Sequence, residues 1–369
     1  MKYYIIAGEA SGDLHGGNMM KSLKKLDTEA QFRVWGGDSM AHESGGNLVK
    51  HYRNTDFVGF TEVIANLRTI LTNIKNCKKD ILSYQPDALV LIDYPGFNLR
   101  IAEFLHENDI KVFYYISPQI WAWKQNRVHK IKRVVDKMFV ILPFEKPFYK
   151  KFNIEVDFVG NPLLDEIDKF KKEYQEEDFR KNNKLDEKPI IALLPGSRTQ
   201  EIKTKLPKML SVIPQFPDYQ FVIGGAPSQN EELYKEIIGN NPSVSLVFGK
   251  TYPLLLNSHA GLITSGTATL ETALFKLPQV VCYKANPISY QIAKRLVKIK
   301  FISLVNLIMD KEIVRELIQK DLSTENLTSE LNKICEGDSR KELLDNYDKL
   351  IHKLGGVGAS ANVAQHITD

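Results

Sequence analysis

Short apolar runs that end in glycine, proline or a polar turn recur along the chain, and stretches of helical period lie between them. The runs are continuous in Val, Ile and Leu, which is typical of strands buried on both faces of a parallel sheet. Strands that alternate with helices predict a doubly wound α/β fold. The expected strands are Tyr3–Gly8, Phe32–Trp35, Ala88–Asp93, Lys111–Ile116, Met138–Leu142, Val156–Val159, Ile190–Leu194, Gln220–Ile223, Val244–Phe248, Gly261–Thr264 and Gln279–Tyr283.

One strongly charged segment divides these strands into two sets. Between positions 165 and 189, 16 of the 25 residues carry charge, so this segment cannot bury enough apolar surface to form a core. We therefore expect a solvated helix and linker at 165–189, between Rossmann-like domains at 1–164 and 190–340. Helices from about 341 are expected to pack back on the first domain. Ligands of such sheets bind at the carboxyl ends of the strands, which predicts a site in a cleft between the two domains.

Composition narrows the classes of partner. Lys and Arg total 49 against 45 Asp and Glu, and a net charge of +4 is too small to indicate nucleic acid as the main partner. The three cysteines, Cys77, Cys282 and Cys335, are too scattered for a disulfide framework or a zinc site. No apolar run approaches the roughly 20 residues that span a bilayer, and Glu9 and Asp13 interrupt the apolar N-terminus too early for a signal peptide. These features predict a cytoplasmic protein and leave peripheral membrane association and the oligomeric state open.

The turn after the first expected strand contains a candidate catalytic carboxylate. Gly8 and Gly12 are spaced G-x-x-x-G, whereas a dinucleotide-binding turn requires G-x-G-x-x-G. The simpler interpretation is a tight turn with Ser11 or Asp13 as a helix cap. Ser11 and Gly12, like Asn98 further along the chain, are also candidates for the acceptor side of the cleft. Glu9 stands at the strand terminus, so its carboxylate is expected to point toward the ligand.

A second carboxylate follows the strand at Ala88. Asp93 ends a continuous apolar run, and burial of an anionic side chain raises its pKa toward the range of a general base. The alternative, weighed equally, is that Asp93 only caps the next helix. Asn98 is a second candidate cap for that helix.

Two tryptophans follow another expected strand. Trp121 and Trp123 stand close to Ser117 and Gln119, and together they are suited to form an apolar wall with polar groups for a sugar ring. The alternative is that both tryptophans fill the core.

The second half of the chain carries two candidate phosphate loops. One is the turn Gly196-Ser197-Arg198, in which the arginine guanidinium offers paired donors to a phosphate. The other is a small-residue turn that opens a helix, whose free N–H groups and dipole favour an anion. Glu271, one turn into this helix, is placed to accept hydrogen bonds from ribose hydroxyls. The residues of this second loop are Ser265, Gly266, Thr267, Ala268, Thr269 and Glu271.

The sequence offers no motif for a metal ion, so a diphosphate bound at these loops is expected to be neutralised by arginine and backbone dipoles. The chain has no D-x-D pair, no H-x-x-x-H pair and no Cys/His cluster, so we expect no metal and no cofactor.

Two stretches are candidates for membrane contact. An amphipathic run of helical period with basic neighbours is one, although a core-facing helix explains its pattern more simply. The other is a basic run in the second half of the chain, which is suited to contact anionic lipid headgroups. The alternative interpretation of this run is a solvent-exposed helix face. The residues concerned are Phe60, Ile64, Leu67, Arg68, Leu71, Lys294, Arg295 and Lys298.

Taken in order, segments spread over nearly the whole chain resemble the lipid-A-disaccharide synthase family, which are bacterial glycosyltransferases of the two-domain GT-B type. The segments are GEASGD (Gly8–Asp13), VGFTEV (Val58–Val63), DYPGFN (Asp93–Asn98), SPQIWAW (Ser117–Trp123), LPFEKPFYKKF (Leu142–Phe152), FVGNP (Phe158–Pro162), LLPGSR (Leu193–Arg198), SGTATLE (Ser265–Glu271), AKRLVK (Ala293–Lys298) and SLVNLI (Ser303–Ile308).

This resemblance implies an inverting hexosyltransferase of lipid A and lipopolysaccharide biosynthesis. It implies transfer of 2,3-diacylglucosamine from its UDP derivative to 2,3-diacylglucosamine 1-phosphate at the cytoplasmic face of the membrane, giving the β-1,6 disaccharide 1-phosphate and UDP. The first domain would then take the acceptor and lipid, and the second the UDP-sugar. Asp93 resembles the essential aspartate of the family, Arg198 its phosphate-binding arginine, and Asn306 a polar residue of its SLPNL block.

The sequence departs from the pattern of the family at three positions. Gly96 stands where many relatives have aspartate, Asn161 where they often have histidine, and Val305 where they often have proline. Asn161 is kept as a candidate for the acceptor side because an amide still donates and accepts hydrogen bonds. Whether Asp93 or Glu9 is the base stays open.

Two other classes of function fit parts of these observations. Another GT-B enzyme, such as a UDP-GlcNAc epimerase or the peptidoglycan glucosaminyltransferase, would share the diphosphate site and use substrates without lipid. A non-catalytic nucleotide- or membrane-binding protein would bind UDP or vesicles and release no UDP from any donor.

Overall fold

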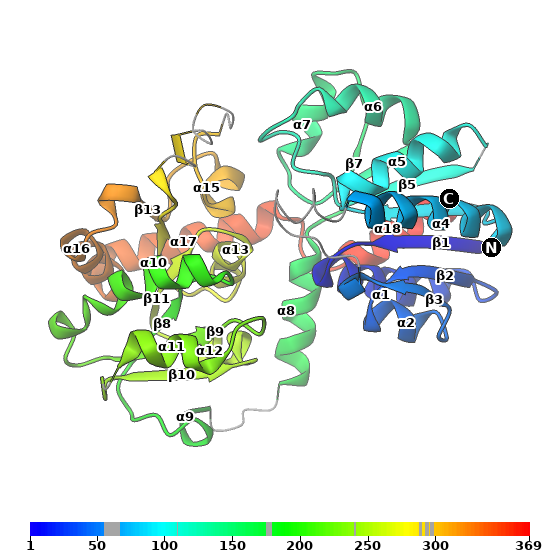
Figure 1. Ribbon diagram of the computed structural model, residues 1–369. Coiled ribbons are helices and arrows are strands. Elements are labelled where there is room, and N and C mark those ends of the chain that lie inside the picture. Colours follow the sequence, from blue (N-terminus) through cyan, green and yellow to red (C-terminus); the bar gives the residue numbers. More distant parts are fainter. Residues whose placement is uncertain are drawn as a thin grey trace. The chain divides into compact units, whose positions relative to one another are not determined.

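A computed structural model of the chain divides into two compact units, Met1–Asp165 with Leu354–Asp369, and Glu166–Lys353. The structure describes residues 1–54, 67–108, 110–174, 179–239, 241–287, 290–291, 295 and 299–369. In both units every strand pair that the structure describes is parallel. The predicted pair of doubly wound sheets is therefore confirmed (Figure 1).

Unit 1 has the strand order β3-β2-β1-β4-β5-β6-β7. The strands are β1 (Lys2–Ala7), β2 (Gln31–Gly36), β3 (Leu48–His51), β4 (Ala88–Ile92), β5 (Lys111–Tyr115), β6 (Lys137–Val140) and β7 (Asp157–Phe158). The helices are α1 (Ala10–Leu26), α2 (Asp38–Glu43), α4 (Leu67–Tyr84), α5 (Pro95–His106), α6 (Arg127–Val134), α7 (Glu145–Lys150) and α18 (Ala359–Thr368), with a 3-10 turn at Tyr52–Asn54.

Unit 2 has the strand order β10-β9-β8-β11-β12-β13. The strands are β8 (Ile190–Leu194), β9 (Gln220–Gly225), β10 (Val244–Phe248), β11 (Ala260–Thr264), β12 (Gln279–Tyr283) and β13 (Arg315–Ile318). Helix α8 (Pro162–Glu173) begins in unit 1 and continues into unit 2. The other helices are α9 (Phe179–Asn182), α10 (Thr199–Leu210), α11 (Glu231–Ile238), α12 (Thr251–Asn257), α13 (Thr267–Leu274), α15 (Leu304–Met309), α16 (Thr324–Cys335) and α17 (Gly337–Lys353), with 3-10 turns at Ile213–Gln215 and Gln319–Asp321.

Alternate side chains of β1 pack into two cores on opposite faces of the unit 1 sheet, because successive side chains of a strand point to opposite faces. Tyr4 and Ile6 join one buried cluster, to which α4, α5, α6 and α7 contribute. Tyr3 and Ile5 join the other, with side chains from α1 and α18 such as Met19. Burial on both faces explains why the central strands are continuous apolar runs.

The strand order places a topological switch point in each sheet. In unit 1 the order reverses between β1 and β4, where Ala7 pairs with Ile92. In unit 2 it reverses between β8 and β11, where Leu194 pairs with Ile263. Open parallel sheets bind ligands at such points, beyond the carboxyl ends of the strands. The loops that follow these four strands are therefore the first place to look for a site.

The return of the chain to unit 1 begins later than the expected position near 341. Helix α17 belongs to unit 2, because its Tyr347 is fully buried there and accepts a hydrogen bond from Gln279. Only the last residues return, and Asp165 caps α18 by accepting hydrogen bonds from the N–H groups of Gly358 (2.6 Å) and Ser360 (2.9 Å). The charged segment is helical over much of its length, in α8 and α9.

Candidate active site

The switch point of unit 1 brings the two predicted carboxylates to neighbouring loops. Glu9 is the N-cap residue of α1 in extended conformation and is exposed, whereas Asp93 follows β4 and is half-buried. Burial raises the pKa of Asp93 to about 7, and the charge of Glu9 adds to this shift. A carboxyl group with this pKa accepts a proton near neutral pH.

The backbone at Asp93 is held in a conformation that side chains rarely adopt. Asp93 (φ 42°) and Tyr94 (φ 47°) are consecutive left-handed residues, and such strain is typical of functional sites. The carbonyl oxygen of Asp93 accepts hydrogen bonds from the Tyr114 hydroxyl (2.5 Å) and from Nδ2 of Asn98 (2.8 Å). Asn98 is fully buried and also donates to the carbonyl of Ile92, so it holds the end of β4 and is not the expected cap of α5.

Neither of the two residues predicted as the cap of the first helix has that role. Asp13 is buried and accepts hydrogen bonds from the N–H groups of Gly37, Ser39 and Met40, so it caps α2 and not its own helix. Ser11 lies inside α1 with an exposed side chain, so it is not the predicted cap either.

Gly12 is the glycine of this turn that brings α1 close to the sheet. A β-carbon on it would lie 3.3 Å from Cβ of Ala7 and 3.6 Å from the side chain of Ile92. Gly12 therefore allows close packing of α1 on β1 and β4, which explains this glycine without a bound dinucleotide.

The two tryptophans do not form one wall. Trp121 is buried and packs edge-to-face on Phe144 at 4.9 Å, which matches the core alternative. Trp123 is 46% exposed, with Nζ of Lys124 4.3 Å from its ring centroid.

The polar residues predicted for the acceptor side likewise include both buried and exposed side chains. Ser117 is buried and shares a 2.7 Å hydrogen bond with the Tyr149 hydroxyl, and Gln119 is exposed. Asn161 is buried, accepts from the N–H of Leu163 and donates to the carbonyl of Ile141, so it holds the start of α8. Of the residues predicted for the acceptor side, Ser11, Gln119 and Trp123 are exposed, and their role there stays a prediction.

The switch point of unit 2 brings the two predicted phosphate loops to neighbouring strands, β8 and β11. Gly196 has a φ of +115°, which only glycine adopts readily. Ser197 is exposed, and its carbonyl oxygen accepts hydrogen bonds from the side chains of Ser228 and Gln229. Arg198 is the exposed N-cap residue of α10, so its guanidinium is accessible to an anion.

The second loop differs in part from the expectation of a row of free hydroxyls. The Ser265 hydroxyl donates to the carbonyl of Ile302, and the fully buried Thr269 hydroxyl donates to the carbonyl of Gly266. Gly266 (φ +151°) and Thr267 are exposed at the start of α13, and Ala268 is half-buried. The exposed backbone at the start of this helix, together with Thr267, is what the loop offers to a ligand.

Two further predicted residues of unit 2 are engaged within the fold. Glu271 is half-buried, burial raises its pKa, and it accepts a hydrogen bond from the Tyr252 hydroxyl at 3.3 Å. Asn306 is fully buried. Its Oδ1 accepts from the N–H groups of Ile313 and Val314, and its Nδ2 donates to Val314 and Glu316. Asn306 therefore ties α15 to β13 and is not the accessible ligand group that the resemblance suggested.

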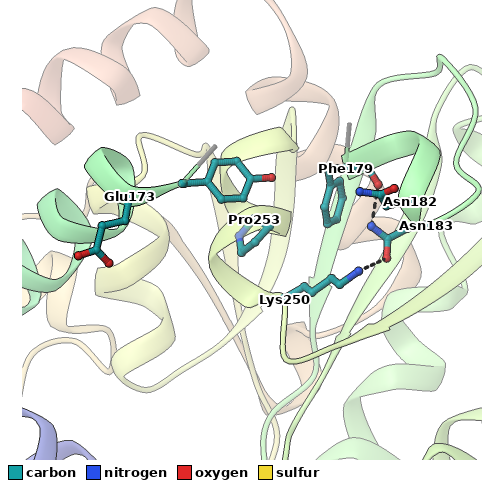
Figure 2. Close-up of a pocket in the computed structure, with 7 residues that line it drawn as sticks. Glu173, Phe179, Asn182, Asn183, Lys250 and Pro253 are labelled. Atoms are coloured by element: carbon teal, nitrogen blue, oxygen red, sulfur yellow. Dashed lines mark hydrogen bonds between the residues drawn. The ribbon is translucent and has the colours of Figure 1, made fainter. Parts of the chain in front are cut away.

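A pocket of about 450 Å³ lies in unit 2 where α8 ends and α9 meets α12 (Figure 2). Nζ of Lys250, at the start of α12, donates to Oδ1 of Asn183 at 3.1 Å. The pocket combines rings, amides and both signs of charge, and none of the predicted site residues lines it. Its lining residues are Glu173, Tyr174, Phe179, Asn182, Asn183, Lys250 and Pro253.

The predicted membrane residues are described only in part. Phe60, Ile64, Lys294 and Lys298 lie outside the described residues, as does the side chain of Leu67. Helix α4 packs Ile74, Cys77 and Ile81 into the core, in agreement with the core-facing alternative. On this helix Arg68 is exposed and Leu71 is 52% exposed, and in the second stretch Arg295 is exposed.

The described ranges contain neither a candidate metal site nor a candidate membrane-spanning helix. No group of three or more His, Cys, Asp or Glu side chains in them is arranged to hold a metal ion. None of the helices in those ranges combines the length and the apolar character needed to cross a bilayer.

Comparison with solved structures identifies the fold. UDP-GlcNAc 2-epimerase from Neisseria meningitidis bound to UDP-GlcNAc superposes with a TM-score of 0.71 at 14% identity, over 100% of both chains. CalG4, the calicheamicin glycosyltransferase, gives a TM-score of 0.62 at 13% identity, over 100% of this chain and 97% of the other. At these identities the likeness concerns the fold alone.

Comparison of sequences identifies the family. A family model described as lipid-A-disaccharide synthetase matches residues 3–366. Two proteins named lipid-A-disaccharide synthase, from Syntrophus aciditrophicus (strain SB) and Trichlorobacter lovleyi, are 38% and 36% identical to this chain. Each match covers 98% of this chain and 95% of the relative. These relatives favour the synthase over an epimerase, a peptidoglycan glucosaminyltransferase or a non-catalytic binding protein. The chain therefore belongs to the lipid-A-disaccharide synthase family of glycosyltransferases.

Proposed function

We propose that the protein transfers 2,3-diacylglucosamine from its UDP derivative to the 6-hydroxyl of 2,3-diacylglucosamine 1-phosphate. The products are the β-1,6-linked disaccharide 1-phosphate and UDP, formed by one inverting displacement. Membership of the family supports the substrates. The observation that carries the mechanism is Asp93, a half-buried carboxyl with a pKa of about 7 at the switch point of unit 1.

Asp93 is the proposed general base. As the acceptor oxygen forms a bond to C1 of the donor sugar, its proton passes to the Asp93 carboxylate. The bond from C1 to the β-phosphate oxygen breaks, and its electron pair leaves with UDP. Positioned proton transfer of this kind contributes roughly 10² to 10⁴ in rate. Glu9 supports the step because its negative charge makes Asp93 a stronger base.

Unit 2 is the proposed holder of UDP. The accessible guanidinium of Arg198 and the exposed start of α13 at Gly266 and Thr267 would stabilise the charge that develops on the diphosphate. The helix dipole alone contributes about 0.3 to 1 kcal/mol. Glu271, held by Tyr252, would accept a hydrogen bond from a ribose hydroxyl. This set neutralises a diphosphate without a metal ion.

The acyl chains of both substrates place the reaction at a membrane. We propose peripheral association with the cytoplasmic face of the inner membrane. The partly exposed outer side of α4, with Arg68 and Leu71, supports contact with lipid headgroups.

The test is UDP release from UDP-2,3-diacylglucosamine with 2,3-diacylglucosamine 1-phosphate, with and without a chelator. We expect release that requires both substrates, persists with chelator and falls strongly when either sugar is deacylated. Equal release from a deacylated donor would favour another GT-B enzyme. Binding of UDP or vesicles without release from any donor would favour a non-catalytic protein.

A further inference from the structure

A lysine is buried directly behind one of the phosphate loops. Lys205, on α10, is 2% exposed, and lysines are almost never buried to this extent without a partner. Its Nζ lies 3.8 Å from Oε2 of Glu201, one helical turn earlier, and burial lowers the pKa of the ammonium group. The Glu201 side chain is 32% exposed, so the pair extends from the interior of unit 2 to its surface.

The anionic member of this pair lies against the loop that follows β8. A β-carbon on Gly196 would lie 2.3 Å from Oε2 of Glu201, so the carboxylate occupies the space that a side chain at position 196 would need. Gly196 thus gives the loop both its left-handed conformation and its close approach to Glu201.

The cationic member lies near both loops of the switch point. The ammonium group of Lys205 is close enough to Glu201 and Arg198 for their charges to interact, and it also lies near the thiol of Cys282. Cys282 belongs to β12, and its carbonyl oxygen accepts the hydrogen bond from the N–H of Ser265. One buried ammonium group is therefore close to the loop that follows β8 and to the strand that holds the loop that follows β11.

Without its lysine, Glu201 would present a bare carboxylate to the loop at Gly196. Like charges within a few ångströms repel strongly where water is partly excluded, so this carboxylate would oppose any diphosphate on the loop. A lysine that only filled space would have no such effect, and an apolar side chain would fill the same space at lower desolvation cost.

We propose that Lys205 is a positioning residue that neutralises Glu201 and so keeps the loop Gly196–Arg198 receptive to the diphosphate of UDP. The inference rests on the proposed function of that loop. It goes beyond that function by assigning the affinity of the loop for phosphate to a buried ion pair that touches no substrate.

The test compares K205M, K205R, E201Q and K205M/E201Q with wild type, using titration calorimetry with UDP and with uridine. K203M is the matched control, because Lys203 is exposed on the same helix. We expect K205M to weaken UDP binding at least about tenfold while uridine binding stays unchanged, since only the diphosphate meets the carboxylate. K205R and the double variant should recover UDP affinity to within about threefold of wild type, because each restores a neutral pair.

Three results would overturn the inference. One is UDP binding by K205M equal to wild type, and another is an equal loss of UDP and uridine binding. The third applies even if K205M fails to fold: E201Q keeps the lysine and loses the anion, so a tenfold weaker binding of UDP by E201Q contradicts the proposal. Wild-type protein that binds no UDP would instead remove the proposed function, and this inference with it.

Discussion

A β-carbon on Gly8 would lie 2.3 Å from Cγ of Tyr94, so the end of β1 and the residue after Asp93 are in contact that only glycine permits. Tyr94 also stacks on Phe97 with ring centroids 5.4 Å apart, so a second contact holds the ring. The position of the strained Asp93–Tyr94 turn therefore depends on a glycine at the end of another strand.

Replacing Gly8 with alanine should displace Tyr94 and lower turnover. Overpacking of this kind costs typically about 1–3 kcal/mol, which we expect as a lower free energy of unfolding in denaturant titration. G96A is the matched control, because a β-carbon on Gly96 meets nothing within 4 Å. Wild-type turnover in G8A would show that the turn does not depend on this contact.

The D93N variant should lose roughly 10² to 10⁴ in kcat, because the amide cannot accept the proton, while its affinity for UDP stays close to wild type. Single-turnover kinetics and calorimetry measure the two quantities. D338N, in a fully exposed side chain of unit 2, serves as the control. Full activity of D93N would remove Asp93 as the base.

The contribution of Asp93 to the stability of the protein should decrease as the pH rises. Folding raises the pKa of Asp93 from 3.8 to about 7, so its contribution to stability is present below pH 3.8 and is lost as the pH rises through 7. Between pH 5 and 8, D93N should therefore lose less stability than wild type, as thermal melts at each pH would show. Identical pH dependence of the two proteins would mean that Asp93 titrates normally.

The E9Q variant should shift the pH profile. Removing the charge of Glu9 lowers the pKa of Asp93, so the active, deprotonated form persists to lower pH. We expect the acid limb of kcat/KM to move below its wild-type midpoint near 7. Glu29 is exposed, and E29Q controls for the general loss of one negative charge. An unmoved acid limb with strongly reduced kcat would instead favour Glu9 as a direct participant.

The R198A and N306A variants should separate ligand binding from support of the fold. R198A removes an exposed guanidinium, so we expect weaker UDP binding at an unchanged melting temperature. N306A leaves buried donors and acceptors unpaired at roughly 1–3 kcal/mol each, so we expect a lower melting temperature, with N332A, at an exposed position of α16, as the control. A normal melting temperature in N306A with lost UDP binding would return Asn306 to the ligand site.

Much of the fold follows from the sequence because central parallel strands are buried on both faces. All eleven apolar runs predicted as strands overlap strands of the two sheets. The missed strands are β3 and β13, which lie at sheet edges and carry charged residues such as Lys50 and Arg315. Edge strands tolerate polar side chains, so periodicity alone does not reveal them.

The placement of polar groups is predictable where they follow central strands: Asp93 is half-buried after β4 and Arg198 is exposed after β8, while their roles stay predictions. It is less predictable where a polar side chain turns inward. Thr269, Asn161 and Asn306 stand in suggestive segments, yet each hydrogen-bonds to the backbone of its own unit. Lys205 is not recognisable from the sequence for the converse reason, because a lysine one turn after a glutamate on a helix normally indicates a surface pair.

The return of residues Leu354–Asp369 to unit 1 has a consequence for biosynthesis. The ribosome synthesises the strands of unit 1 first, but Val363 and Ile367, which cover Met19 on α1, emerge only after the whole of Glu166–Lys353. Until α18 has been synthesised, that apolar face has no cover from this helix, while the whole of Glu166–Lys353 is already available to fold. Nascent chains that stall between residues 353 and 359 should therefore be targets for chaperones, with unit 1 as the exposed part.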